Sequence, residues 1–321
     1  SHELTERFIL KYFTNDLLAP LHDGAQFPVS SGRMAFTTDS YVVQPTFFPG
    51  GNIGKLAVCG TVNDLAMNGA VPQYLSCGLI LEEGLPFDEL EEILSTMADM
   101  AKLANVQIVT GDTKVVKKGE VDKIYINTAG IGMIPEDIHI SPNFVKPNMD
   151  IILSGSIGDH SIAVMGERFG LELSNSIKTD CAPLNHMVHE VLQEVGPQVA
   201  LLRDPTRGGV GTVLKEIAEQ SQVGIKVEES QFVIHDEVKS VCDILGYDPL
   251  YLANEGKCIF VVDPTVTDRV LDILHGFQEG REATRIGVTM DKNIGKVGLQ
   301  TSIGGVRLVD LLGEDQVPRI C

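Results

Sequence analysis

The sequence has 321 residues, and 25 Lys and Arg against 44 Asp and Glu give it a net charge of −19. So acidic a chain repels nucleic acid and anionic membranes, so neither is an expected partner. No apolar run reaches membrane-spanning length and no signal peptide is visible, so the cytoplasm is the expected location. The length favours two ordinary globular domains over one large domain.

The first part of the chain alternates predicted strands and helices. An amphipathic helix is expected over residues 3–14, with Leu4 and Phe8 on its apolar face. Residues 110–113, which contain a glycine and two threonines, are predicted to form a loop. The other elements expected here are strands over 33–43, 73–81, 106–109 and 122–134, and helices over 54–68 and 86–104.

A proline-containing segment, residues 141–150, is the predicted linker to a second alternation of strands and helices. The last residues, 311–321, are polar and predict a flexible, extended tail. We therefore predict two α/β domains, over 1–140 and 150–310, followed by this tail. The elements expected in the second domain are strands over 151–154, 200–202, 258–262 and 284–288, and helices over 160–169, 209–220, 238–245 and 266–275.

Four aspartates lie next to predicted loops, where carboxylates from separate segments can converge. They are Asp39, Asp64, Asp112 and Asp204. Such carboxylates can hold Mg²⁺, which in turn binds phosphates. Each of them taken alone is more typical of a helix cap or a turn, so both interpretations stay open.

Glycines precede a predicted helix at Gly208 and Gly209. The free N–H groups of a helix start can bind an anion, but the same residues also suit a helix start with no ligand. The sequence contains no Walker A motif and no strand-linked GxGxxG, so the common nucleotide-binding folds are not supported.

Three further polar residues are candidates for chemistry. Lys114 follows an aspartate at a predicted strand end and could polarise a substrate, although such a lysine is usually solvated. Glu255 precedes an apolar strand and could be a general base, although turn carboxylates are common. His160 begins a predicted helix, where a histidine is more often structural than catalytic.

The chain ends in a cysteine, Cys321, and none of its six cysteines forms a CxxC pair that would suggest zinc. A prenylation motif would place the cysteine four residues from the end, so that signal is absent. A tail gives a thiol reach and exposure, which suits a carrier or an acceptor. An accidental terminal residue is the alternative.

Eight segments of the sequence carry a resemblance to a known family. They are 38–42 (TDSYV), 47–56 (FFPGGNIGKL), 63–66 (NDLA), 111–116 (GDTKVV), 158–160 (GDH), 206–209 (TRGG), 254–257 (NEGK) and 318–321 (PRIC). On these segments the chain resembles the HypE family of hydrogenase maturation proteins. This family lies within the superfamily of aminoimidazole ribonucleotide (AIR) synthetase, thiamine-monophosphate kinase and selenophosphate synthetase. The C-terminal segment PRIC is the most specific match, because the chains of the superfamily's kinases and synthetases do not end in it.

The resemblance implies an ATP-dependent carbamoyl dehydratase. In this family a HypF-type carbamoyltransferase loads a carbamoyl group onto the C-terminal thiol, and ATP drives its dehydration to a thiocyanate. The cyanide then passes to iron on a HypC–HypD-type scaffold complex, for the NiFe-hydrogenase site. The implied fold is a two-domain, AIR-synthetase-like α/β fold. Its N-terminal domains form a β-barrel across a homodimer.

The resemblance also implies residue roles. The four aspartates would bind Mg²⁺–ATP, with Asn63, Thr113 and the Arg207-Gly208-Gly209 turn near the phosphates. Lys114 would orient the carbamoyl oxygen on Cys321 and Glu255 would relay protons, with His160 a further candidate in that pocket. The tail would fold inward for chemistry and swing outward for delivery.

The family normally opens with a Gly-rich segment that reaches the nucleotide, and this sequence starts after it. The resemblance implies that ATP affinity and turnover depend on that segment. Two other functions stay open. A small-molecule kinase of the superfamily would act independently of Cys321, and a docking protein would hydrolyse no ATP. Selenophosphate synthetase is disfavoured, because no reactive Cys followed by Lys lies near the N-terminus.

Overall fold

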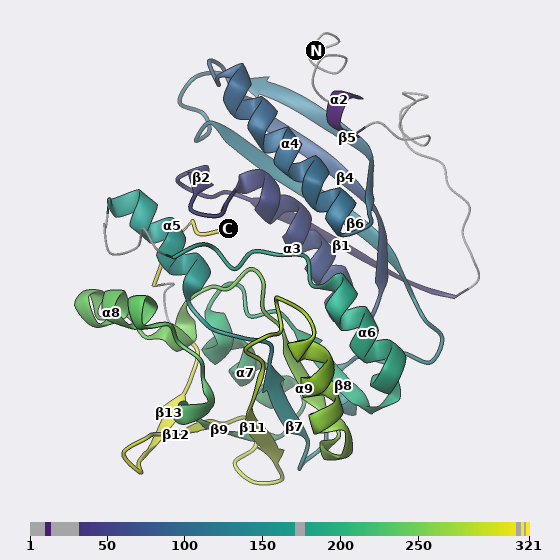
Figure 1. The fold of residues 1–321 in the computed structure, drawn as a ribbon, viewed down its shortest axis with the longest axis vertical. Coiled ribbons are helices and arrows are strands. Elements are labelled where there is room, and N and C mark those ends of the chain that lie inside the picture. Colours follow the sequence, from purple (N-terminus) through teal and green to yellow (C-terminus); the bar gives the residue numbers. More distant parts are fainter. Residues whose placement is uncertain (1–9, 14–31, 171–176, 313–315, 318) are drawn as a thin grey trace.

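The computed structural model describes residues 10–13, 32–170, 177–312, 316–317 and 319–321, and two sheets organise them (Figure 1). A four-stranded sheet has the order β1-β6-β4-β5, and a seven-stranded sheet has the order β13-β12-β9-β11-β7-β10-β8. The strands of the smaller sheet end by Ile134, and those of the larger sheet begin at Asp150. Each sheet is covered by helices, as expected for a two-part α/β chain.

The smaller sheet is covered on one face by two helices, α3 and α4 (Figure 1). Side chains alternate along its strands, so that Leu75 and Leu79 are buried under the helices while Phe36 and Ile80 are exposed on the other face. The elements of this part are α2 (Leu10–Phe13), β1 (Arg33–Tyr41), β2 (Phe47–Phe48), β3 (Gly51–Asn52), α3 (Ile53–Met67), β4 (Val71–Glu82), α4 (Phe87–Leu103), β5 (Gln107–Val116) and β6 (Ile124–Ile134).

The larger sheet is covered on both faces near its centre. Helices α6 and α9 pack on one face against Phe260, and α7 packs on the other against Val261. The elements are β7 (Asp150–Leu153), α5 (Asp159–Phe169), α6 (Asn185–Val195), β8 (Val199–Arg203), α7 (Gly209–Gln220), β9 (Gly224–Glu228), α8 (Asp236–Leu245), β10 (Ile259–Val262), α9 (Thr267–His275), β11 (Thr284–Met290), β12 (Val297–Gln300) and β13 (Val306–Val309). Short 3₁₀ helices cover Pro142–Phe144, Gly196–Gln198, Glu229–Gln231, Pro249–Tyr251 and Pro264–Val266.

The described tail residues return to the smaller part of the molecule. Ile320 is buried in the apolar cluster that includes Val43, Phe48 and residues of α3 and α4. Val317 packs at the edge of the same cluster. The C-terminus therefore lies between α3 and α5 (Figure 1), and Cys321 is hydrogen-bonded to Val42, the residue after β1.

The structure corrects one predicted loop. Residues 110–113 lie inside β5, because this strand pairs in parallel with β4 through Gly111 and Cys77, and through Asp112 and Gly78. The glycine allows the close approach, since a Cβ at Gly111 would lie 2.1 Å from the Cys77 carbonyl oxygen. The predictions missed α6 and the strands β2, β3, β9, β12 and β13.

The other predicted elements are present, with shifted ends. The exceptions are Leu4 and Phe8, which lie outside the described residues, while the predicted linker holds a 3₁₀ turn and the first residue of β7. Among the described helices, none is both long and apolar enough to cross a membrane.

Candidate active site

The thiol of Cys321 lies next to the carboxyl group of Glu255. A cavity of about 270 Å³ beside it is lined by residues that include Ser40, Arg207, Tyr251 and the tail itself. Burial, followed by the nearby Glu255 charge, raises the pKa of the Cys321 thiol, and Arg207 opposes this only in part. A thiol kept protonated suits a group that carries the substrate better than one that attacks it.

Glu255 is a buried carboxyl group with unused hydrogen-bonding capacity. It is 3% exposed, and its Oε1 atom has no hydrogen-bond partner among the described residues. Burial, followed by the charges of Asp180 and Asp204, raises its pKa well above the ordinary value. A carboxylate of raised pKa is a stronger base, which is what proton removal from a weakly acidic group requires.

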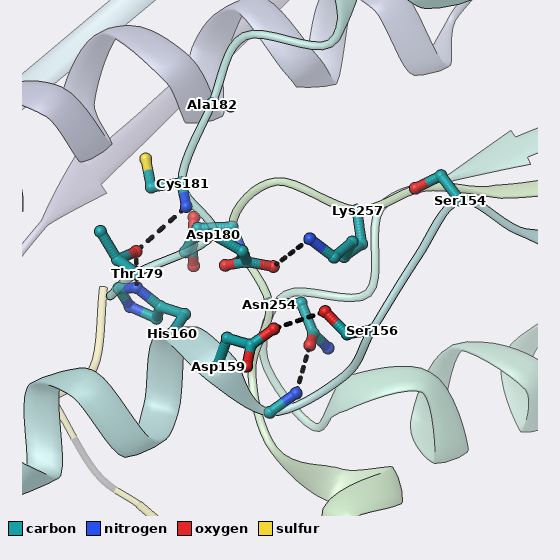
Figure 2. A network of polar contacts seen from close by, with 12 residues as sticks. Ser154, Ser156, Asp159, His160, Thr179, Asp180, Cys181, Ala182, Asn254 and Lys257 are labelled. Carbon is teal, nitrogen blue, oxygen red and sulfur yellow. Dashed lines mark hydrogen bonds and ion pairs between the residues drawn. The ribbon is translucent and has the colours of Figure 1, made fainter. Parts of the chain in front are cut away.

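The turn that carries Glu255 is fixed by an adjacent segment, residues 177–184. The main-chain N–H of Glu255 donates to Oδ1 of Asp180 at 3.0 Å, and Nζ of Lys257 lies 3.4 Å from Oδ2 (Figure 2). Gly256 makes this approach feasible, since a Cβ there would lie 1.8 Å from the Asp180 carbonyl oxygen. Lys257 and Asp180 thus fix the position of the turn that carries Glu255, the candidate base.

Three of the four predicted aspartates come together. Asp39 on β1, Asp64 on α3 and Asp204 after β8 lie close enough for each pair to interact electrostatically. Burial, followed by the charge of Asp64, raises the pKa of Asp204 to about 7. Burial also raises the pKa of Asp64, although Thr37 donates a hydrogen bond of 2.8 Å to its Oδ2. A cavity of about 370 Å³ lined by Thr37, Asp64, Arg203 and Asp204 adjoins them.

This carboxylate group fits a magnesium–phosphate ligand rather than a preformed metal cage. Among the described residues, no three His, Cys, Asp or Glu side chains already gather around one metal position. Mg²⁺ usually takes only one or two carboxylates and completes its shell with water and substrate phosphates. Repelling carboxylates on a polar cavity match that chemistry, with Asp39, Asp64 and Asp204 as the residues that would hold the ion.

The glycine turn before α7 has the backbone that its sequence predicts. Gly208 and Gly209 have φ angles of 75° and 62°, in the left-handed region that favours glycine. A Cβ at Gly209 would lie 2.6 Å from the carbonyl oxygens of Leu250 and Leu252. Arg207 is exposed beside the cavity at Cys321, so the turn presents a cation and a helix start to this side of the site.

Asn63 does not have the free side chain expected of a phosphate ligand. Its Nδ2 donates to the carbonyl oxygens of Ala182 and Glu255 at 3.1 and 3.3 Å, and its Oδ1 accepts from the N–H of Leu184 at 2.8 Å. Asn63 therefore ties α3 to segment 177–184 and to the Glu255 turn, and it shapes the site through these contacts.

The segment with Asp112, Thr113 and Lys114 lies apart from the other candidates within one chain. It is on β5, and β6 and β4 separate that strand from Asp39 on β1. Lys114 forms an ion pair with Asp112 at 3.1 Å, with both side chains 70% exposed. Within a single chain, these residues face solvent rather than Cys321.

His160 contacts the main chain of the tail, whereas Glu255 is the residue next to the Cys321 thiol. Its Nε2 lies 2.9 Å from the carbonyl oxygen of Ile320, and its Nδ1 lies 2.8 Å from Oγ1 of Thr179 (Figure 2). Both ring nitrogens are therefore engaged, which makes His160 a residue that places the tail.

Sequence reasoning missed Thr37, Asp180, Thr179 and Lys257. Lys257 belongs to segment 254–257, which carries the family resemblance, and this is the one feature of the sequence that could have indicated it. Asp180 and Thr179 lie in a segment without regular secondary structure, so no periodicity or motif marked them.

Comparison with known proteins decides the family. Residues 22–134 match the AIR synthase related protein, N-terminal domain, and residues 146–300 match the corresponding C-terminal domain. A carbamoyl dehydratase HypE of Rhizobium leguminosarum bv. viciae is 48% identical over 99% of this chain and 91% of its own length. This chain belongs to the HypE family. A HypE of Escherichia coli K12 is 42% identical over 99% of this chain and 95% of its own length.

Solved structures confirm the HypE fold. A crystal structure of HypE in complex with ATP has a TM-score of 0.96 and 45% identity, covering 100% of this chain and 96% of that chain. HypE in a HypE–HypF complex has a TM-score of 0.85 and 44% identity, covering 96% of this chain and 99% of that chain. Thiamine monophosphate kinases share the fold alone, at 17% to 19% identity. The expected AIR-synthetase-like family and fold are thereby confirmed.

Proposed function

We propose that this chain uses ATP to dehydrate an S-carbamoyl group on its own Cys321 to a thiocyanate. The reaction balances as R–S–C(=O)NH₂ plus ATP giving R–S–C≡N, ADP, phosphate and a proton. The observation that carries the proposal is the placement of the Cys321 thiol against the buried Glu255 carboxyl, in a pocket next to three carboxylates. The HypE relatives named carbamoyl dehydratase support it.

The chain's residues divide the chemistry between them. The carbamoyl oxygen takes the γ-phosphoryl group as the bond to ADP breaks, and it then leaves as phosphate while C≡N forms. The nitrogen loses two protons in this process. Glu255 would accept them one at a time, passing the first to the departing phosphate and releasing the second to solvent. The burial of Glu255 and of Ile320 in the tail would limit the access of water to the activated carbamoyl group.

The nucleotide would bind over the carboxylate group. Asp39, Asp64 and Asp204 would hold Mg²⁺, which when bound would neutralise phosphate charge. The Arg207-Gly208-Gly209 turn would face the phosphates, because it offers a cation and free N–H groups at the start of α7. The crystal structure of a HypE with ATP supports a nucleotide site in this fold.

A second copy of the chain would supply Asp112, Thr113 and Lys114. The uncovered face of the smaller sheet exposes the apolar side chains of Met34, Phe36 and Ile80, and a sheet face of this kind needs a cover. Pairing two such sheets in the proposed β-barrel homodimer would bury these side chains and bring β5 of one copy toward the site of the other. Asp112 would then join the Mg²⁺–ATP site, and Lys114 would reach the carbamoyl oxygen.

The expected partners follow from the same reaction. A HypF-type carbamoyltransferase would load Cys321, which the solved HypE–HypF complex supports, and a HypC–HypD-type iron scaffold would receive the cyanide. We place this activity in the cytoplasm and assign it to domains over 1–140 and 150–310 with the tail over 311–321.

Mass spectrometry of the C-terminal peptide tests the proposal. After incubation with the carbamoylating partner, addition of ATP and Mg²⁺ should lower the mass of the carbamoylated peptide by one water. The variant Cys321→Ala should show neither the carbamoyl adduct nor carbamoyl-stimulated ATP hydrolysis. Full substrate-stimulated turnover in Cys321→Ala would instead indicate a kinase that acts on a free small molecule.

A further inference from the structure

The main chain of the tail is recognised in the manner of a bound peptide. The N–H group of Val42 donates to a main-chain carboxylate oxygen of Cys321, and that of Gln44 donates to the carbonyl oxygen of Arg319, each at 3.4 Å. This spacing is that of a short antiparallel strand added beyond the end of β1. Arg168 donates to both strands of this pairing, at 2.7 Å to the Gln44 carbonyl and 2.6 Å to the Arg319 carbonyl.

His160 provides a further contact from the opposite side. A carbonyl oxygen can only accept, so Nε2 of His160 carries the hydrogen that bonds the Ile320 oxygen. In a neutral ring Nδ1 then accepts from the Thr179 hydroxyl, whose oxygen also accepts from the N–H of Cys181. The rings of Phe48 and His160 pack edge to face, with their centroids 5.6 Å apart, and this contact holds the imidazole in one orientation.

Side-chain selection comes from Ile320 and Gln316. Ile320 is 4% exposed, whereas Arg319 is 57% exposed and pairs with the carboxylate of Asp122. The amide of Gln316 accepts from the main-chain N–H of Asp248 at 2.9 Å and donates to its carbonyl oxygen at 3.1 Å. Val317, three residues before Ile320, packs at the edges of two apolar clusters. A chain end with glutamine at position 316, an apolar residue at 317 and Ile-Cys at 320–321 would therefore satisfy the same contacts.

We infer that this groove is a peptide-binding site that accepts a separate C-terminal peptide ending in Ile-Cys, so that S-carbamoylated peptides are substrates in trans. The catalytic part rests on the proposed function, while the binding part does not. The described contacts are made by residues 316, 317 and 319–321, and none of them depends on the tail being attached to β13. The attached tail simply has the advantage of an effective concentration on the order of millimolar.

Ligand-observed NMR titration with the synthetic peptide Gln-Val-Pro-Arg-Ile-Cys tests the binding part. The full chain with Ile320→Glu should expel its own tail and leave the groove open, since a carboxylate cannot be buried in the apolar pocket. We expect the peptide to bind this variant and to bind the wild-type chain about tenfold more weakly, because the attached tail competes. Equal binding to the two chains would overturn the inference.

Three controls separate specific recognition from surface adhesion. A peptide with glutamate in place of isoleucine should bind neither chain. In the Ile320→Glu background, His160→Phe should weaken binding about tenfold, whereas His160→Gln, whose amide can still donate to a carbonyl, should keep most of it. Ile320→Ser provides a second, smaller change that opens the groove. Lack of saturable binding to either opened chain up to about 10 mM peptide would contradict the inference.

The catalytic part is tested with the same peptide after its thiol has been carbamoylated by cyanate. ATP and Mg²⁺ should convert it, in the Ile320→Glu chain, to a product lighter by one water. If the peptide binds but is not converted, catalysis in trans is wrong, while the assignment of the groove as a peptide-binding site stands. If the wild-type tail also failed to lose water, the proposed function itself would be wrong.

Discussion

Nζ of Lys257 lies 3.4 Å from Oδ2 of Asp180, and the two side chains are 10% and 3% exposed. A buried ion pair adds little net stability, because removing both charges from water opposes their attraction. The position of this pair indicates what it does instead. Asp180 also accepts the N–H of Glu255, so the pair fixes the turn that carries the candidate base.

We expect Lys257→Met to lower the free energy of unfolding by about 3 kcal/mol, because it leaves the Asp180 carboxylate buried without a cation. The double variant with Asp180→Asn removes both charges and should recover most of that loss. Urea denaturation of the single and double variants measures the coupling. Additive losses would show that the two side chains do not act as a pair.

Asp204 predicts a particular dependence of stability on pH. Burial, followed by the charge of Asp64, raises its pKa to about 7, whereas an unfolded aspartate titrates near ~3.9. Between these values the folded chain holds the proton more tightly, so its stability falls as the pH rises through this window. The penalty is complete above pH ~7 and absent below pH ~4.

Asp204→Asn should remove this penalty. Without nucleotide or Mg²⁺, we expect the variant to exceed the wild type in unfolding free energy at pH 8 by on the order of 2 kcal/mol, since solvent screens this half-buried group. The difference should vanish near pH ~4. Guanidinium denaturation at both pH values measures it, and a constant difference would rule out titration of Asp204 as its cause. Calorimetry should show Mg²⁺–ATP affinity falling about tenfold.

Local patterns predicted most of the helices and strands, because those elements have regular side-chain spacing. The helix α4 is typical, with Leu90, Ile93, Leu94 and Met97 on its buried face. Residues 110–113 could not be placed in the same way, because their strand conformation depends on pairing with β4, which is distant in sequence. A glycine and an aspartate favour a turn locally, and the sheet overrides that preference.

Part of the site was predictable for a similar reason. Asp39 and Asp64 lie near the ends of β1 and α3, Asp204 directly follows β8, and ends of neighbouring elements converge. Whether Asp112 joins them depends on strand order, which the sequence does not reveal. That order places Asp112 on the edge strand opposite β1. The contact of His160 with the tail required knowing that residues 319–321 return to α5, which no local pattern contains.

The uncovered face of the smaller sheet predicts a dimer interface. One charged substitution in that interface should dissociate the dimer. Phe36 is 71% exposed on that face, so we expect Phe36→Glu to convert a wild-type dimer to a monomer in analytical ultracentrifugation, because burying a carboxylate in the interface is unfavourable. Phe87 is 64% exposed but lies at the start of α4, on the covered side of the sheet. Phe87→Glu is therefore the matched control and should stay dimeric. Persistence of the Phe36→Glu dimer would place the interface elsewhere.

A mixing experiment addresses the separation of Lys114 from Glu255. If Lys114 acts on the tail of a second copy, Lys114→Ala and Glu255→Ala should each bind ATP and fail to dehydrate the carbamoyl group. After the two variants are unfolded together and refolded, half of the dimers pair one copy of each. One site in each mixed dimer then has both wild-type residues, so about a quarter of all sites should recover activity.

The control for this recovery is a mixture that cannot complement. Glu255→Ala refolded with the double variant Lys114→Ala, Glu255→Ala has no site with an intact base, so it should stay inactive. Mass spectrometry of the C-terminal peptide measures water loss in each mixture. No recovery in the first mixture would mean that Lys114 and Glu255 serve the same copy. That result would require β5 to move within its own chain, since its exposed ion pair with Asp112 lies at the far edge of the sheet.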